Sequence, residues 1–161
     1  VENLIERMIQ YSDNEAKELL LRNLDQNFII KVMTDIGINT NGNMAADFVS
    51  VKDYSGFFRL LYNATYLNRE MSEKALQILS KTSYENGILA GIPKGVTVSH
   101  KFGERAYADS NIKQLHECGI VYLQGSPYLI CIMTRGTDFN QLQSVISDVS
   151  KIVYKNTTKV R

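Results

Sequence analysis

Two short motifs offer side chains that could transfer a proton beside a bound anion. Residues 12–14 (Ser-Asp-Asn) supply a hydroxyl, a carboxylate and an amide, and residues 101–104 (Lys-Phe-Gly-Glu) begin with an ammonium group. A serine hydroxyl can relay a proton because it both donates and accepts hydrogen bonds. A lysine ammonium holds a compact positive charge where an anionic group could bind. This chemistry requires the two motifs, far apart in the chain, to meet in the fold.

Each motif also has a purely structural interpretation. Ser-Asp-Asn is a common start of a helix, and Lys-Phe-Gly-Glu suits a strand that ends in a turn. Arg105, Arg135 and His116 could add positive charge for a bound anionic group, or the arginines could form surface ion pairs. His100 is expected to be a structural neighbour of Lys101 rather than an acid or base. The elements that carry the motifs decide between these interpretations.

The first half of the chain has the pattern of helices, and Ser12 lies in the turn between the first two. Apolar residues at helical spacing predict helices over residues 1–10, 13–24, 25–36, 50–62 and 75–79. Ser12 or Asp13 can cap the second helix, Asp25 can cap the third, and Ser50 with Asp53 resembles a capping box. Residues 39–43 (Asn-Thr-Asn-Gly-Asn) predict a turn.

The second half changes to the pattern of strands and carries Lys101. Strands are predicted over residues 96–102, 115–123 and 128–134, with a turn at 93–95 and a hairpin loop at 124–127. The last strand is apolar at nearly every position, so both of its faces should be covered. Residues 139–153 predict a long amphipathic helix that lies on the sheet. We therefore expect an α+β fold, with a helical subdomain over 1–90 and an antiparallel meander with a closing helix over 91–161.

The composition excludes several classes of protein. The 161 residues are 44% hydrophobic and 22% charged, and Lys+Arg 18 against Asp+Glu 17 leaves a net charge of +1, so no nucleic-acid partner is expected. Apolar runs such as 128–133 are too short to form a transmembrane segment. With two histidines and no His/Cys cluster, no metal site is expected.

The two cysteines, Cys118 and Cys131, lie on neighbouring predicted strands. A bridge between them is possible, but two buried thiols are favoured.

The order of the two motifs, their contexts and the closing helix make the chain resemble the penicillin-recognising serine hydrolases, most closely the class A β-lactamases. That family has a Ser-x-x-Lys nucleophile motif, then Ser-Asp-Asn, then Lys-Thr-Gly on a strand facing the site. Residues 12–14 match the second motif and residues 101–103 the third. The resemblance covers nearly the whole chain, which corresponds to roughly the last two thirds of a family member. It implies a β-lactamase/transpeptidase-like catalytic domain whose upstream part is missing here.

The resemblance implies a role for each residue of the two motifs. Ser12 would protonate the leaving nitrogen, and Lys101 would orient Ser12 and attract the substrate carboxylate. Asn14 would bind a substrate amide, and Asp13 would brace the loop through backbone amides. Gly103 would let the backbone approach the substrate, and the backbone N–H of Glu104 would stabilise the oxyanion. Phe102 would lie at the substrate-binding position where the family has a Thr or Ser hydroxyl.

The chain departs from the family pattern in three respects. The Ser-x-x-Lys motif should lie upstream of Ser12, and the one match inside the chain, residues 110–113, follows Lys101 and is read as coincidence. The family loop whose glutamate orients the deacylating water is not matched, since no Glu lies between Glu18 and Glu70 and Asp47 is the only spare carboxylate near that position. Phe102 also removes the hydroxyl that would bind the carboxylate.

The function implied is that of a serine hydrolase that forms an acyl-serine with β-lactams or D-Ala-D-Ala-like peptides and deacylates slowly. Its nucleophile would come from an upstream segment of the same protein, so the fragment alone should be inactive. A D-Ala-D-Ala carboxypeptidase or transpeptidase and an inactive cell-wall-peptide binding module are the alternatives. No metal or organic cofactor is implied. The resemblance also implies a bacterial, exported (secreted, periplasmic or cell-surface) protein linked to β-lactam resistance.

Overall fold

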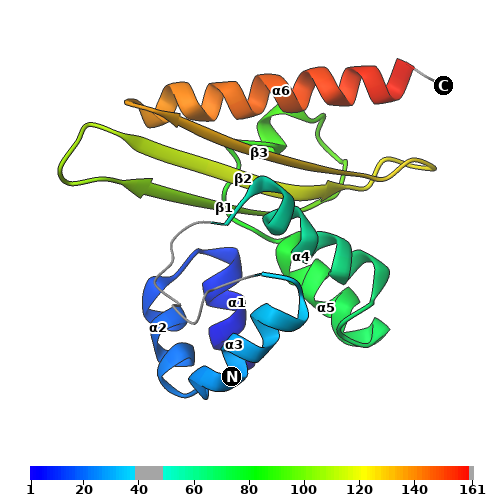
Figure 1. Cartoon of the computed structure of the whole chain (residues 1–161). Coiled ribbons are helices and arrows are strands. Elements are labelled where there is room, and N and C mark those ends of the chain that lie inside the picture. Colours follow the sequence, from blue (N-terminus) through cyan, green and yellow to red (C-terminus); the bar gives the residue numbers. More distant parts are fainter. Residues whose placement is uncertain (39–48, 160–161) are drawn as a thin grey trace.

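Within the described residues, five helices form a layer on one side of the molecule (Figure 1). The computed structural model describes residues 1–38 and 49–159. In chain order the helices of this layer are α1 (Glu2–Gln10), α2 (Asn14–Arg22), α3 (Gln26–Asp35), α4 (Val51–Asn63) and α5 (Arg69–Leu79). Figure 1 shows them together below the sheet. The predicted turn at 39–43 and Asp47 lie outside the described residues.

Side-chain caps begin four of these helices. The Asp13 carboxylate accepts hydrogen bonds from the backbone of Glu15 and Ala16, so Asp13 rather than Ser12 caps α2. Asp25 caps α3 and Ser50 caps α4, as predicted. Asn68 caps α5, which begins earlier than the apolar pattern over 75–79 indicated because Met71, the one apolar residue among 69–74, is exposed.

An antiparallel meander follows the helices. After a short 3₁₀ turn, η1 (Leu89–Gly91), come β1 (Val98–Ala106), β2 (Lys113–Val121) and β3 (Tyr128–Gly136), in the order β1-β2-β3. Each of the first two strands lies where one was expected, but β1 begins two residues later and ends four residues later than predicted, and β2 begins and ends two residues earlier. The later end of β1 arises because its backbone pairing continues through the exposed residues 104–106, whereas the prediction followed buried apolar side chains.

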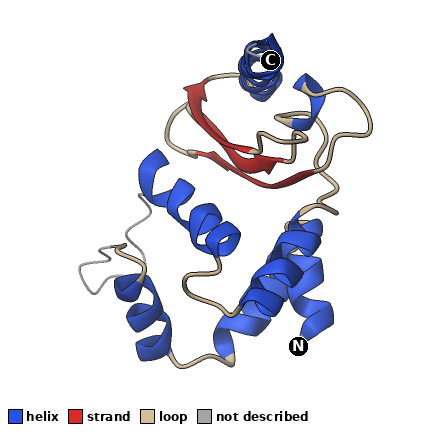
Figure 2. Ribbon diagram, turned by 90° about the vertical axis from the view of Figure 1, so that its right-hand side faces the viewer, coloured by secondary structure: helices blue, strands red, loops and turns tan. Residues whose placement is uncertain are grey.

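Helices cover both faces of the sheet. The closing helix α6 (Phe139–Lys159) packs on one face around a core of buried apolar residues that includes Leu115, Val121 and Ile146. On the other face α4 and α5 pack through Phe58, Leu76 and Leu79. Figure 2, viewed at right angles to Figure 1, shows the sheet between α6 and the helical layer. Because β3 contacts both α6 and α4, the expectation that both of its faces are covered is confirmed.

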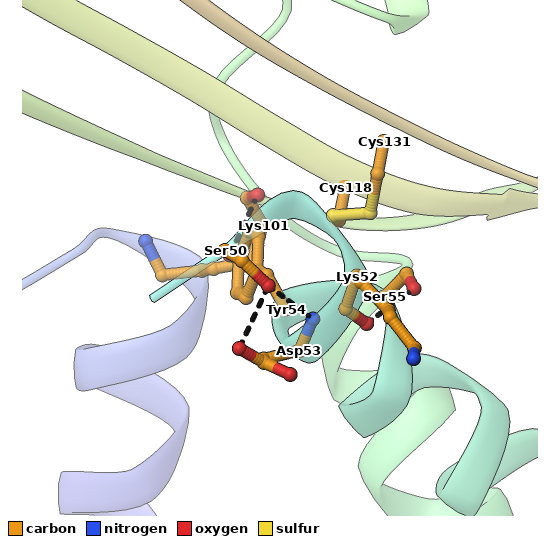
Figure 3. Close-up of a disulfide and its surroundings, with 8 residues drawn as sticks. All are labelled: Ser50, Lys52, Asp53, Tyr54, Ser55, Lys101, Cys118 and Cys131. Atoms are coloured by element: carbon orange, nitrogen blue, oxygen red, sulfur yellow. Dashed lines mark hydrogen bonds between the residues drawn. A yellow bond between two sulfur atoms is a disulfide. The ribbon is translucent and has the colours of Figure 1, made fainter. Parts of the chain in front are cut away.

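A disulfide joins the second and third strands. Cys118 and Cys131 are directly opposed in the β2–β3 ladder and are bonded through their sulfurs. The prediction of two buried thiols is therefore wrong, and the alternative of a bridge is correct. Sequence alone could not decide this, because the register that opposes the two residues depends on the hairpin between them. Figure 3 shows the disulfide close to the first turn of α4.

The structure bears on two further expectations. Across residues 1–38 and 49–159, no helix combines the length and apolar character needed to cross a membrane. The same residues hold no cluster of three or more potential metal-binding side chains of the His, Cys, Asp and Glu types. The division into parts 1–90 and 91–161 stays a prediction.

Candidate active site

Ser12 and Lys101 meet between the helical layer and the sheet. The Lys101 ammonium donates a hydrogen bond to Ser12 Oγ at 2.5 Å and another to the backbone oxygen of Phe102 at 2.9 Å. Ser12 lies between α1 and α2, and Lys101 lies in the middle of β1. The fold thus brings together two side chains 89 residues apart.

The turn that carries Ser12 has an unusual backbone conformation. Ser12 has a φ of 55°, in the left-handed region that residues other than Gly, Asn and Asp seldom adopt. On either side, the N–H groups of Tyr11 and Asp13 both donate to the Arg7 carbonyl. Asp13 also forms an ion pair with Arg7 at 2.5 Å. Hydrogen bonding from Ala16, with Arg7 beside it, lowers the pKa of Asp13, so this carboxylate stays charged while it holds the turn.

Lys101 is partly buried, and this changes its acid–base behaviour. Burial lowers the pKa of Lys101 to about 8, although the negative charge of Glu117 opposes the shift. The amine is still mainly protonated at neutral pH and remains a hydrogen-bond donor. Its ammonium also lies 4.5 Å from the centre of the Phe102 ring. The Tyr54 hydroxyl donates to the Lys101 carbonyl at 3.0 Å and so ties this part of β1 to α4.

Gly103 packs directly against a neighbouring side chain. A Cβ at this position would overlap the His116 ring, with Cε1 only 2.6 Å away. His116 in turn packs edge-on against Tyr54, with ring centres 5.3 Å apart. Burial, reinforced by the charge of Lys101, lowers the pKa of His116, so the ring is neutral at pH 7. The close packing of His116 accounts for the glycine before any substrate is considered.

Phe102 faces an aromatic partner within the fold. Its ring stacks on Tyr84 with centres 4.0 Å apart and an interplanar angle of 18°. It also packs against the core beneath α6. This packing explains an aromatic residue at 102 independently of substrate.

The outer edge of β1 carries backbone groups that point away from the sheet. Successive residues of an edge strand direct their backbone groups alternately toward the neighbouring strand and away from it. The carbonyls of His100 and Phe102 accept from Thr82 and Lys101, so these residues face outward. Glu104 is the next position in this alternation. Its side chain is exposed, as is Asn14 at the start of α2.

A buried hydrogen-bonded pair lies behind Lys101 on the opposite face of β1. His100 Nδ1 lies 2.6 Å from Glu117 Oε1, and both side chains are almost fully buried. Glu117 also accepts a hydrogen bond from the Ile88 N–H. His100 is thus a structural neighbour of Lys101, as expected. The partner Glu117 was missed, although a glutamate within the apolar run of 115–121 is a signal of a buried charge that needs a partner.

A hollow of about 440 Å³ lies beside this arrangement, between α4 and the ends of β2 and β3. Tyr54, His116, Met133 and Arg135 are among the residues that line it. Its link to the Ser12–Lys101 pair is His116, which packs against Gly103. Of Arg105, Arg135 and His116, the last two therefore border one hollow, and Arg135 rather than the neutral His116 could supply positive charge there.

Comparison with known proteins identifies the family. The family model Beta-lactamase2, described as the Beta-lactamase enzyme family, matches residues 1–157. The chain belongs to the beta-lactamase enzyme family. No curated protein matches the chain.

Solved structures of members and relatives share the fold. PBP-A has a TM-score of 0.79 and 21% identity, over 98% of this chain and 61% of that chain. The beta-lactamase from Chitinophaga pinensis DSM 2588 has a TM-score of 0.84 and 16% identity, over 96% of this chain and 64% of that chain. The class A beta-lactamase from Mycobacterium abscessus has a TM-score of 0.78 and 17% identity, over 97% and 64%. A point mutant of PBP-A has been solved as an acyl-enzyme complex with penicillin G.

Two conclusions follow for this beta-lactamase-family chain. The resemblance in fold class is confirmed, since the α+β architecture matches structures of class A enzymes and of PBP-A. The chain spans 61–64% of the length of these three structures. The activity of the whole protein therefore requires a separate argument.

Proposed function

We propose that this chain forms part of a serine hydrolase of the β-lactamase/penicillin-binding type. The observation that carries the proposal is the hydrogen bond from Lys101 to Ser12. The substrates would be β-lactams or D-Ala-D-Ala-like peptides, and the acyl-enzyme of the PBP-A mutant with penicillin G supports this class of ligand. An acyl bond would form between a serine oxygen and the substrate carbonyl carbon while the amide C–N bond breaks.

In this proposal Ser12 delivers a proton to the departing nitrogen. Because Ser12 Oγ accepts a hydrogen bond from the Lys101 ammonium, its own proton is free to point toward a substrate. Lys101 can replace that proton and also attract the substrate carboxylate. Both functions need the protonated amine, which dominates below its pKa of about 8.

The outer edge of β1 would bind the rest of the substrate. An extended peptide can add to an exposed edge as a further strand. The outward N–H of Glu104 would donate to the developing oxyanion, and Gly103 keeps that stretch free of a side chain. Asn14 would bind a substrate amide from the opposite side.

The attacking serine would belong to a Ser-x-x-Lys segment preceding this chain in the complete protein. The matched structures are longer than this chain by more than a third of their own length, which leaves room for such a segment. We also propose an exported location, and the Cys118–Cys131 disulfide is consistent with an oxidising compartment.

The experiment that tests the role of Ser12 is acylation of the complete protein by a fluorescent penicillin. Ser12→Ala should slow acylation by about 10²- to 10⁴-fold, the usual contribution of a positioned proton donor. Ser144→Ala is a matched control, because Ser144 is exposed on α6 and bonds only within its helix. Unchanged acylation in Ser12→Ala would show that another group protonates the leaving nitrogen.

We further expect the acyl-enzyme to persist. No glutamate lies between Glu18 and Glu70 to orient a deacylating water. Mass spectrometry after mixing with penicillin should show the added mass for hours. A return to the original mass within seconds would contradict this.

A D-Ala-D-Ala carboxypeptidase or transpeptidase is the second candidate. The missing glutamate favours it, as does the similarity to PBP-A. Release of D-alanine from a cell-wall pentapeptide would support it over a β-lactamase.

An inactive cell-wall-peptide binding module remains the third candidate because Phe102 stacks on Tyr84 where the family has a hydroxyl. Failure of the complete protein to be acylated at all would favour that module.

A further inference from the structure

The loop after α5 contacts both elements that carry the Ser12–Lys101 pair. Its first contact is with β1. Thr82 is buried, and its hydroxyl lies 2.8 Å from the carbonyl oxygen of His100, the residue before Lys101. The same hydroxyl lies 2.9 Å from the carbonyl of Leu79, the last residue of α5. Thr82 thus connects the end of α5 to β1 immediately beside the lysine.

The next residue contacts the element that carries the serine. The backbone N–H and the hydroxyl of Ser83 both donate to the carbonyl oxygen of Gln10, each at 2.9 Å. Gln10 is the last residue of α1 and precedes Ser12 by two positions. Ser83 therefore fixes the end of α1 to the same loop that Thr82 fixes to β1.

The third residue contacts β1 on the other side of Lys101. Tyr84 stacks on Phe102 with ring centres 4.0 Å apart. Thr82 and Tyr84 consequently hold His100 and Phe102, the two neighbours of Lys101. Three consecutive residues, Thr82, Ser83 and Tyr84, thus connect the serine turn with both flanks of the lysine. We call them the 82–84 clamp.

The Ser12–Lys101 contact needs such support for two physical reasons. Ser12 has a left-handed φ of 55°, a conformation that persists only where its surroundings impose it. A lysine side chain also has many rotamers, so a 2.5 Å contact to one oxygen requires its backbone to be fixed. Proton transfer is sensitive to displacements of about 1 Å.

We propose that the 82–84 clamp sets the distance between Ser12 and Lys101, so that Thr82, Ser83 and Tyr84 act as positioning residues. The role of the Ser12–Lys101 distance in proton transfer rests on the proposed function. The effect of the 82–84 clamp on that distance can be tested without any substrate. If the clamp loosens, water reaches the Lys101 amine. Because burial lowers the pKa of Lys101, hydration should raise it from about 8 toward the ordinary value of 10.5.

The direct test is an NMR titration of Lys101 in the 161-residue chain labelled at its lysine side chains. The Lys101 signal is assigned by its loss in Lys101→Met. In Thr82→Val, which has nearly the same shape but no hydroxyl, the titration midpoint should rise by at least about half a pH unit. Thr157→Val makes the same chemical change on α6, where the hydroxyl bonds within its own helix, and should leave the midpoint unchanged.

Two further variants keep the test decisive if Thr82→Val unfolds. Thr82→Ser restores the hydroxyl and should return the midpoint to the wild-type value. Tyr84→Leu keeps an apolar side chain but removes the stacking on Phe102 and should raise the midpoint. A folded Thr82→Val or Tyr84→Leu with the wild-type midpoint would overturn the proposal, because a merely structural role would alter stability without altering Lys101.

A second measurement connects the clamp to the reaction. In the complete protein, Thr82→Val should slow acylation by a fluorescent penicillin by about ten- to a hundredfold, and Thr157→Val should not. If the wild-type protein is not acylated, the proposed function fails, and the titration still decides on the clamp. A raised midpoint with unchanged acylation would overturn the assignment of 82–84 as positioning residues for the reaction.

Discussion

Lys101 keeps an ammonium group in a site that disfavours charge. Burial lowers its pKa to about 8, which means that the folded protein loses stability by holding this proton. The hydrogen bonds to Ser12 and to the Phe102 carbonyl offset part of that loss. An arrangement that costs stability and aims a charged donor at a hydroxyl is typical of a functional site.

Because burying the ammonium lowers stability, the effect of Lys101→Met on the free energy of unfolding should depend on pH. Below pH 8 the amine is charged in both folded and unfolded chains, and its burial destabilises the fold. Between pH 8 and the unfolded value near 10.5 the unfolded chain binds more protons, so wild-type stability rises with pH. Urea unfolding at pH 7 should show Lys101→Met more stable by about 1–2 kcal/mol, a value reduced for partial exposure.

The difference between Lys101→Met and wild type should shrink as the pH rises from 8 to 10.5. Lys155→Met on the exposed face of α6 serves as the control and should show no such trend. A constant difference across this range would mean that packing, rather than the charge, accounts for the effect.

The two motifs could be predicted at the residue scale, but much of what supports them could not. Ser12 and Lys101 were identifiable because their side-chain types suit one chemistry. The reason for Gly103 is the His116 ring, which no spacing in the chain reveals. Likewise, the bond from Ser83 to Gln10 joins residues 73 apart and follows only from tertiary packing.

At the scale of elements, the docking of α6 depends on a small residue in η1. A Cβ on Gly91 would overlap the Ser147 carbonyl and lie 2.7 Å from the Lys151 nitrogen, both backbone atoms of α6. Backbone atoms within a helix cannot move aside as a flexible side chain can. Gly91 therefore lets η1 approach α6 closely.

Gly91→Ala should lower the free energy of unfolding by about 1–3 kcal/mol, because it overfills this contact. Gly56→Ala in α4 is the matched control, since a Cβ there meets nothing within 4 Å. That control should raise stability by about 0.5–1 kcal/mol through helix propensity. Thermal or urea unfolding measures both. Equal effects of the two substitutions would contradict the close packing of η1 on α6.

The elements themselves were largely predictable because local signals defined them. The caps Asp13, Asp25 and Ser50 each precede a run of apolar residues at helical spacing. The end of β1 lies four residues beyond its predicted position because its pairing extends into the exposed residues 104–106, where the hydrophobic pattern gives no signal. The register of β2 against β3 depends on the geometry of the turn between them, which composition does not specify. The disulfide depends on that register, so it could not be predicted either.

For the whole molecule, one face of α6 suggests where further protein would pack. Val145, Val149 and Ile152 follow one another at helical spacing and are 49%, 37% and 58% exposed. The helix α6 also contacts β3, which is an end strand of the described sheet. We propose that the segment supplying the Ser-x-x-Lys motif covers this apolar surface in the complete protein.

Ile152→Lys tests this arrangement by comparing two lengths of protein. In the 161-residue chain the substitution should change the free energy of unfolding by less than about 0.5 kcal/mol, because the position is exposed. In the complete protein it should destabilise by about 2 kcal/mol or more, because the lysine would be buried without a partner. A similarly small effect in both proteins would mean that the extra segment packs elsewhere.

The disulfide in the sheet affects how the protein should be prepared for kinetic measurements. Cys118 is in register with Lys101 on one side and with Cys131 on the other, so one row across the three strands holds both the lysine and the bond. A chain produced in the reducing cytosol of a host cell would carry two thiols in that row instead. Titrating thiols in every preparation would show which covalent form a kinetic measurement describes.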